Sequence, residues 1–301
     1  MTTGPRTEGR PALVLLATGL GLFMVFLDAT IVNVALPEIQ RDFDVGEAGI
    51  QWVVAGYSLT MGMFMMSSAS LADSRGRRRA YIAGLLVFAV GSALCGLAPS
   101  ILTLSFARGI QGVGAATVNV ASLALVGAAY PDPRAKTRAI GAWTGIAAVG
   151  LAIGPTVGGV LTEEVGWRSI FLVNPLFAAL AIALTLAFVK ESKDPVRRSL
   201  DPPGQVLFIV GVGTITYALV EGPHDGWSSP LIVGLLVVST VVTTLFIRTE
   251  LHSSDPMMDV RVFRDRVYTA AIVTIFAVLF AIYGTMLLIT QYLQNVRGYS
   301  P

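Results

Sequence analysis

The sequence is poor in charge, cysteine and histidine, and each shortage excludes a class of protein. Only 13% of its 301 residues are charged, about half the share found in soluble domains. The single cysteine, Cys95, excludes an intramolecular disulfide framework and a cysteine-based metal cluster. The two histidines are too few for a histidine metal site, and the net charge of +2 gives no support to nucleic-acid binding. No metal or cofactor is therefore expected.

Long runs of apolar residues make up most of the sequence. Hydrophobic residues make up 54% of the chain, and the mean hydropathy is +0.70. A bilayer-spanning helix needs about 20 apolar residues. Runs of that kind fall at 12–36, 50–71, 80–98, 101–129, 139–161, 170–189, 204–220, 230–247 and 267–293. The fold class that these runs predict is an all-α, polytopic membrane protein.

Lysine and arginine are distributed unevenly over the segments between these runs. If the N-terminus lies in the cytoplasm, seventeen of them fall on the inner side and three on the outer side. Because cytoplasmic loops carry an excess of Lys and Arg, this distribution sets the orientation. We expect a multi-pass protein of the plasma (inner) membrane, with a cytoplasmic N-terminus and the lipid bilayer as its surroundings.

Two ionisable side chains lie within the predicted spans, Asp28 in the first and Arg108 in the fourth. A charge at the middle of a spanning helix costs about 2.5–3.5 kcal/mol on insertion scales. Each residue lies about 12 Å below the outer surface at a rise of 1.5 Å per residue. Opposite charges at one depth offset each other's desolvation when their helices are neighbours. Two interpretations stay open: a permanent ion pair that fastens two helices, and a carboxylate that exchanges protons.

A basic motif joins the second and third spans on the inner side. It contains Asp73, Gly76, Arg77 and Arg78. Gly76 permits a tight turn, and Asp73 is expected either to cap the next helix or to pair with the arginines. The simpler interpretation is that the arginines only anchor the loop on the cytoplasmic side.

The fifth span carries glycines at four-residue spacing. Gly150, Gly154 and Gly158 predict a flat face for close helix packing, with Gly159 beside it. Pro155 removes a backbone donor and favours a kink.

Uncharged polar residues also lie in the spans. They are Asn33, Tyr57, Gln111, Asn119 and Gln291. The first four are candidates for lining a substrate cavity, and each is equally consistent with an ordinary hydrogen bond between helices.

These motifs together resemble those of the major facilitator superfamily, and specifically its group of 14-span drug:proton antiporters. The first-span segment 27–37 is similar to that group's first-helix motif. Asp73, Gly76, Arg77 and Arg78 match the loop motif; Arg108, Gln111, Gly112 and Gly114 match the fourth-helix motif; and Gly150, Gly154, Pro155, Gly158 and Gly159 match the antiporter motif. Ala69 and Ser74 depart mildly from the loop motif, which usually has glycine and arginine there.

The resemblance implies an organisation that the chain fills only in part. Residues 1–11 would be a cytoplasmic N-terminus, 12–189 an N-terminal bundle of six helices built as a 3+3 inverted repeat, and 190–203 a cytoplasmic linker. Residues 204–247 would be two inserted helices, 248–266 a cytoplasmic loop, and 267–301 the first helix of an incomplete C-terminal bundle. We expect the full-length protein to be a monomer.

The function that the resemblance implies is proton-coupled antiport that exports drugs, antibiotics or other small amphipathic molecules, cationic or aromatic in character. The proton gradient would supply the energy. Asp28 would carry the proton, Arg108 would adjust its affinity for it, and the motif around Gly76 would gate the inner side. One alternative is a truncated fragment that does not transport, or a half that needs a partner chain. Another is an intramembrane enzyme, which the absence of a metal-binding pair, a nucleophile elbow and an in-membrane histidine disfavours.

Overall fold

A computed structural model describes residues 11–193, 201–253, 256, 258–293 and 297, and the regular elements in this part of the chain are all helical. They are α1 (Pro11–Phe43), α2 (Glu47–Arg75), α3 (Arg77–Gly96), α4 (Ile101–Ala129), α5 (Pro133–Val165), α6 (Ser169–Leu172), α7 (Asn174–Phe188), α8 (Pro202–Asp225), α9 (Pro230–His252), the short 3-10 helix η1 (Val260–Arg264) and α10 (Arg266–Gln291). The predicted all-α class is confirmed.

The helices are mostly longer than the predicted spans. Seven stretches of the described chain are long and apolar enough to cross a membrane: α1, α3, α4, α5, α6 with α7, α8 and α9. The nine expected spans also included α2 and α10, which are not among these seven. α2 has the length, at 29 residues, but its sequence is rich in glycine and serine and therefore less apolar.

Two predicted spans differ from the structure near a proline. The run 170–189 divides into α6 and α7, since Pro175 in the first turn of α7 lacks a backbone donor. The run 204–220 was predicted to end too early, because α8 continues past Pro223 to Asp225. Glu221 therefore lies inside α8, one residue beyond the predicted end of that run.

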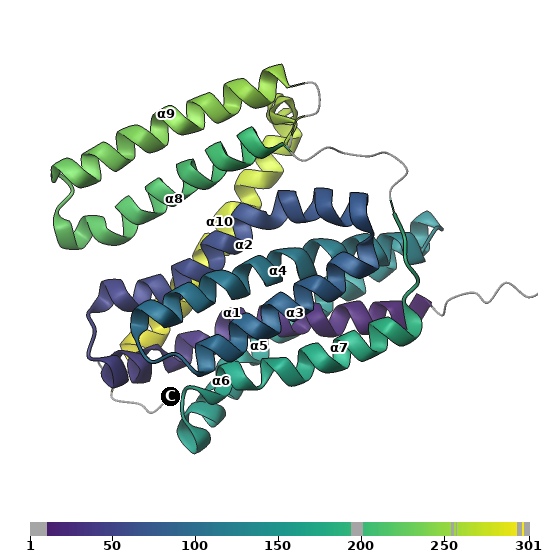
Figure 1. Cartoon of the computed structure of the whole chain (residues 1–301), viewed down its shortest axis with the longest axis horizontal. Helices are drawn as coiled ribbons and strands as arrows, with labels where there is room; N and C mark the ends of the chain where they lie inside the picture. The colour runs from purple at the N-terminus through teal and green to yellow at the C-terminus, as the bar shows by residue number, and fades with distance from the viewer. Residues whose placement is uncertain (1–10, 194–200, 254–255, 257, 294–296, 298–301) are drawn as a thin grey trace, which may run out of the picture.

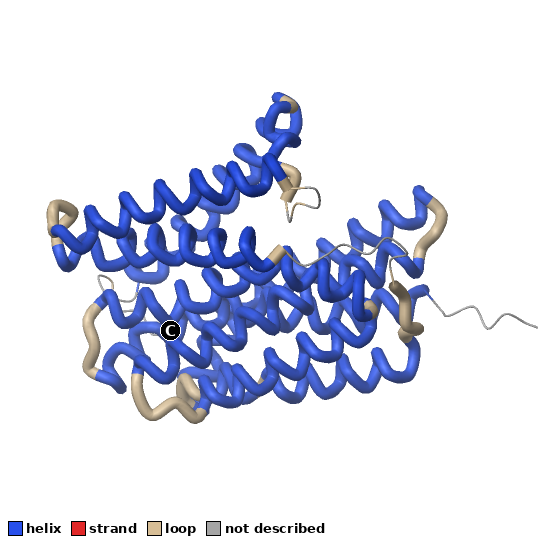
Figure 2. Tube along the Cα trace, turned by 45° about the horizontal axis from the view of Figure 1, so that its top comes forward, coloured by secondary structure: helices blue, strands red, loops and turns tan. Residues whose placement is uncertain are grey.

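The first seven helices pack into one bundle, in which the same pairing occurs twice. α1 packs along α5, as α4 packs along α2, and α1 and α4 meet near the centre. α8 and α9 lie side by side along one edge, where α8 rests on α2 (Figures 1 and 2). α10 contacts η1 and α1. This doubled arrangement agrees with an inverted repeat in which α1 and α4 are equivalent.

Small residues bring α3 against α4 at the centre of the bundle. A Cβ atom at Gly91 would lie 2.6 Å from the backbone nitrogen of Gln111, and one at Gly114 would lie 2.4 Å from that of Phe88. Only glycine permits this approach. The close contact places the polar side chains of the two helices within reach of each other.

Candidate functional site

Asp28 lies near the middle of α1, and its side chain is completely buried. Its partner is Arg108 on α4, whose Nη1 lies 2.5 Å from the Asp28 Oδ2 atom. The Arg108 side chain is 2% exposed, so both charges are removed from solvent. The sequence placed these residues at one depth, and the structure brings them into contact.

The guanidinium of Arg108 is also held by α2. Its Nε donates a hydrogen bond of 3.1 Å to the carbonyl oxygen of Val53. The Tyr57 ring lies 4.2 Å from the guanidinium carbon, within the range of a cation–π contact, and the Tyr57 hydroxyl donates to the Val25 carbonyl of α1. Arg108 therefore joins α4 to both α1 and α2.

Two amides satisfy the other carboxylate oxygen of Asp28. Gln111 Nε2 on α4 and Asn174 Nδ2 on α7 each donate to Oδ1 at 2.8 Å. Gln111 Oε1 in turn accepts from Arg108 Nη1 at 2.7 Å. The buried carboxylate thus receives three hydrogen bonds from two helices, so that both of its oxygens have partners.

Ser92 on α3 completes this polar cluster. Its hydroxyl accepts from Asn174 at 2.9 Å and from Gln111 at 3.1 Å, and it donates to the carbonyl of Phe171 at 2.8 Å. That carbonyl lies in α6, just before the break between α6 and α7. Besides α1 itself, five helices therefore contribute to the surroundings of Asp28: α2, α3, α4, α6 and α7.

Sequence reasoning did not assign Ser92 or Asn174 to the site. Neither residue is among the polar span residues or the motif residues described above. Depth in the membrane could have identified them, because both residues lie in the outer halves of their predicted spans, as Asp28 and Arg108 do.

The four candidate cavity residues separate into two groups. Tyr57 and Gln111 are buried and contact Arg108, so they belong to the ion-pair cluster. Asn33 on α1 and Asn119 on α4 are partly exposed. The side chain of Gln291 lies outside the described part of the chain.

The basic motif between α2 and α3 forms a compact turn. Arg77 donates to Asp73 Oδ1 through Nε at 2.9 Å and through Nη2 at 2.8 Å. The expected pairing of Asp73 with an arginine is therefore present, whereas the alternative, a side-chain cap on α3, is absent from this described helix end. Gly76 has φ of +117°, a conformation in which a side chain is strained.

A carboxylate that is distant in sequence caps α3 instead. Glu191, which follows α7, accepts from the backbone nitrogens of Arg78 at 3.0 Å and Arg79 at 3.2 Å. Arg78 also donates through Nη2 to the Leu186 carbonyl. A negative group at a helix N-terminus is stabilised by the free N–H groups there. The turn is thereby fixed to the segment after α7.

The glycine face of α5 packs against α1, as the spacing predicts. A Cβ atom at Gly150 would lie 2.8 Å from the Phe23 carbonyl oxygen, and one at Gly158 would lie 2.7 Å from that of Ile31. Between them, Thr30 of α1 donates to the Leu151 carbonyl at 3.2 Å. α5 continues as a helix through Pro155.

Replacing Gly158 with Ala should lower the stability of the bundle by about 1–3 kcal/mol, since the added methyl group forces α1 and α5 apart. Gly145→Ala on the same helix is the matched control, because nothing lies within 4 Å of a Cβ atom there. Thermal unfolding of the two purified variants in one detergent measures the difference. Equal melting temperatures for both variants would contradict the packing described here.

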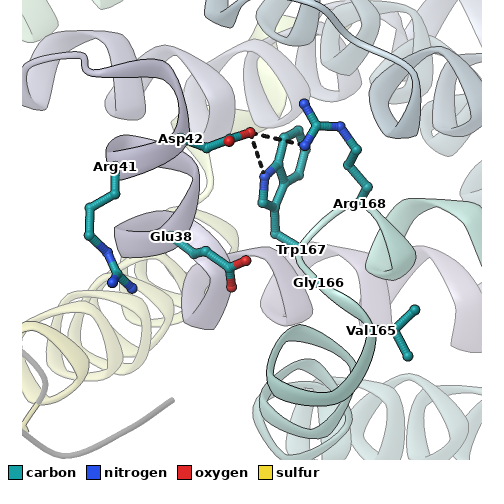
Figure 3. Close-up of a pocket in the computed structure, with 7 residues that line it drawn as sticks. All are labelled: Glu38, Arg41, Asp42, Val165, Gly166, Trp167 and Arg168. Carbon is teal, nitrogen blue, oxygen red and sulfur yellow. Dashed lines mark hydrogen bonds and ion pairs between the residues drawn. The ribbon is translucent and has the colours of Figure 1, made fainter.

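A second polar cluster lies where α1 ends. Asp42 Oδ2 accepts from Trp167 Nε1 at 3.1 Å and from Arg168 Nη1 at 2.9 Å, beside a cavity of about 400 Å³ (Figure 3). Asp42 lies beyond the predicted span 12–36. These two hydrogen bonds, from Trp167 and Arg168, hold the pKa of Asp42 below its usual range. The cluster ties the α1–α2 end of the bundle to the start of α6.

A helical bundle with seven stretches that are long and apolar enough to cross a membrane, and with an ion pair buried between two of them, defines a multi-pass membrane protein. The chain belongs to the Major Facilitator Superfamily, whose family model matches residues 18–301. This membership confirms the resemblance to the superfamily seen in the motifs.

Several named proteins align with most of this chain. It is 57% identical over 289 residues to the multidrug resistance protein Stp of Mycobacterium tuberculosis, covering 96% of this chain and 54% of the relative. It is 45% identical over 293 residues to the drug efflux pump JefA of the same species, covering 97% and 58%. Identity to a methylenomycin A resistance protein of Streptomyces coelicolor is 34% over 298 residues, covering 99% and 62%. The chain thus spans little more than half the length of these relatives.

Proposed function

We propose that this chain is part of a proton-coupled antiporter that exports small amphipathic molecules, including drugs or antibiotics. The observation that carries the proposal is Asp28, a buried carboxylate held by Arg108 between two spanning helices. Ionisable side chains inside the membrane are rare and concentrate in proton relays and ion pathways. The relatives named for multidrug resistance and drug efflux support export as the direction of transport.

In this mechanism a proton competes with Arg108 for the Asp28 carboxylate. A proton on the carboxylate removes its charge and weakens the bond to Arg108, which leaves the guanidinium with Gln111 and the Val53 carbonyl. The contact between α1 and α4 then loosens, and the bundle can change the side to which its cavity opens. A proton that moves down 100 mV supplies about 2.3 kcal/mol, enough for a roughly fifty-fold concentration ratio of substrate.

The remaining candidate residues take supporting roles in the same mechanism. Asn33 and Asn119, which are partly exposed, are the candidates for contact with the substrate. The turn around Gly76, with Asp73, Arg77 and Arg78, gates the inner side. The orientation follows from the distribution of Lys and Arg, which places the N-terminus in the cytoplasm.

Transport-coupled proton movement tests the proposal directly. The protein is reconstituted into vesicles that contain a pH-sensitive dye, once as the 301-residue chain and once with any in-frame continuation. Addition of a transported dye or antibiotic should then drive protons across the membrane, and a protonophore should abolish substrate accumulation. Substrate accumulation that persists at full rate with the protonophore present would overturn proton coupling.

A further inference from the structure

A groove lies between α2, α4 and the inserted helix α8, on the outside of the bundle. Its volume is about 590 Å³, within the range of small-molecule sites. Its walls are mainly apolar and aromatic, with Leu59 and Trp52 from α2, Phe106 from α4 and Tyr217 from α8. One acidic side chain, Glu221 of α8, also lines it.

Glu221 is a negative group without a positive partner among the described residues. Trp52 Nε1 donates to its Oε1 at 2.7 Å, which fixes the carboxylate at the groove. The described salt bridges do not include Glu221, and the described residues that line the groove contain no lysine, arginine or histidine. A carboxylate on an apolar wall is costly unless a positive charge or further donors approach it.

Aromatic rings lie beside this carboxylate. The ring centroids of Trp52 and Tyr217 are 5.6 Å apart, and the Phe106 side chain is 69% exposed. The faces of such rings attract organic cations, and tryptophan does so most strongly. The combination of a fixed carboxylate and aromatic faces is therefore suited to a ligand that is both cationic and hydrophobic.

We propose that this groove binds a small amphipathic organic cation, with Glu221 pairing to its charge and the rings of Trp52 and Tyr217 packing on its apolar part. The site is separate from the Asp28 cluster. Gly109, the chain neighbour of Arg108, lines the groove, while the Arg108 side chain is buried inside the bundle against Asp28 of α1. The proposal therefore does not rest on proton coupling.

The site could not be placed from the sequence, because the seventh span was predicted to end at residue 220. With that end, Glu221 belongs to a loop and has no aromatic neighbours. In the structure, α8 continues beyond it and leans on α2, so that Glu221 faces Trp52.

Two ions of the same shape and opposite charge test the proposal. Equilibrium dialysis of the purified chain in detergent measures the binding of tetraphenylphosphonium and of tetraphenylborate. We expect the wild-type chain to prefer the phosphonium ion. Glu221→Gln should weaken phosphonium binding about tenfold, since it removes one charge–charge contact at a partly buried site. Glu221→Lys should reverse the preference and favour the borate ion.

A control variant separates this site from the rest of the protein. Glu164→Gln removes an exposed carboxylate at the end of α5 and should leave phosphonium binding unchanged. Equal binding of both ions, or wild-type phosphonium binding by Glu221→Gln, would overturn the proposal and indicate an apolar groove for lipid chains.

Discussion

Replacing Asp28 with Asn is expected to abolish proton-driven efflux while leaving the protein folded in the membrane. The amide keeps an oxygen that can accept from Gln111 and Asn174, but it has no proton to exchange. Arg108 retains two acceptors, the Val53 carbonyl and Gln111 Oε1, so that its charge is not left without hydrogen bonds. Efflux of a fluorescent substrate from cells, driven by an imposed pH gradient, measures the effect.

Loss of coupling must be distinguished from loss of substrate binding. Exchange of labelled substrate across vesicles at equal pH requires binding and conformational change but no net proton movement. Asp28→Asn should therefore retain this exchange while accumulation against a gradient disappears. If the variant pumps at the wild-type rate, Asp28 does not carry the proton.

Replacing Arg108 with Leu is expected to destabilise the bundle by about 3–5 kcal/mol, because it leaves the Asp28 carboxylate buried without its counter-charge. The contacts of the guanidinium with the Tyr57 ring and the Val53 carbonyl are lost as well. Thermal unfolding in detergent and the yield of inserted protein measure the change.

The double variant Asp28→Asn with Arg108→Leu provides the control for this result. It removes both charges, so that most of the stability should return, although proton-driven transport should not. A double variant as unstable as Arg108→Leu alone would show that packing, rather than the unpaired charge, causes the loss.

The pairing of Asp28 with Arg108 could be predicted because helix geometry is regular. Asp28 is eight positions from the outer end of its predicted span and Arg108 is seven positions from that of its own, and α4 begins at Ile101, as the sequence indicated. A fixed rise per residue then converts position into depth. The glycine face of α5 was predictable for the same reason, since a spacing of four keeps residues on one side of a helix.

The partners of this pair could not be predicted in the same way. Ser92 and Asn174 are small polar residues of a kind that is common in spans, and only the rotation of α3 and α7 determines where they point. The break before Asn174 also depends on tertiary contacts. Pro175 is compatible with a continuous helix start, and it is the Ser92 bond to the Phe171 carbonyl that occupies the acceptor freed there.

In α8 the helix was predicted to end too early, although it continues through a proline. Pro223 lies outside the predicted run 204–220, whereas the helix tolerates it close to its C-terminal end, where few further hydrogen bonds depend on it. The helix ends instead at Gly226, which has φ of +86° and whose N–H bonds the Gly222 carbonyl.

The hydrogen bond from Thr30 to Leu151 has a consequence for how the bundle can move. It lies two residues from Asp28 and joins α1 to the glycine face of α5, so it fastens these two helices to each other. Thr60 does the same for the other pair, since it bonds the Gly109 carbonyl and joins α2 to α4. The Asp28–Arg108 bond lies between these two helix pairs, as does the bond from Tyr57 to Val25, so a change of charge at Asp28 acts on the contact between the pairs rather than on the packing within either.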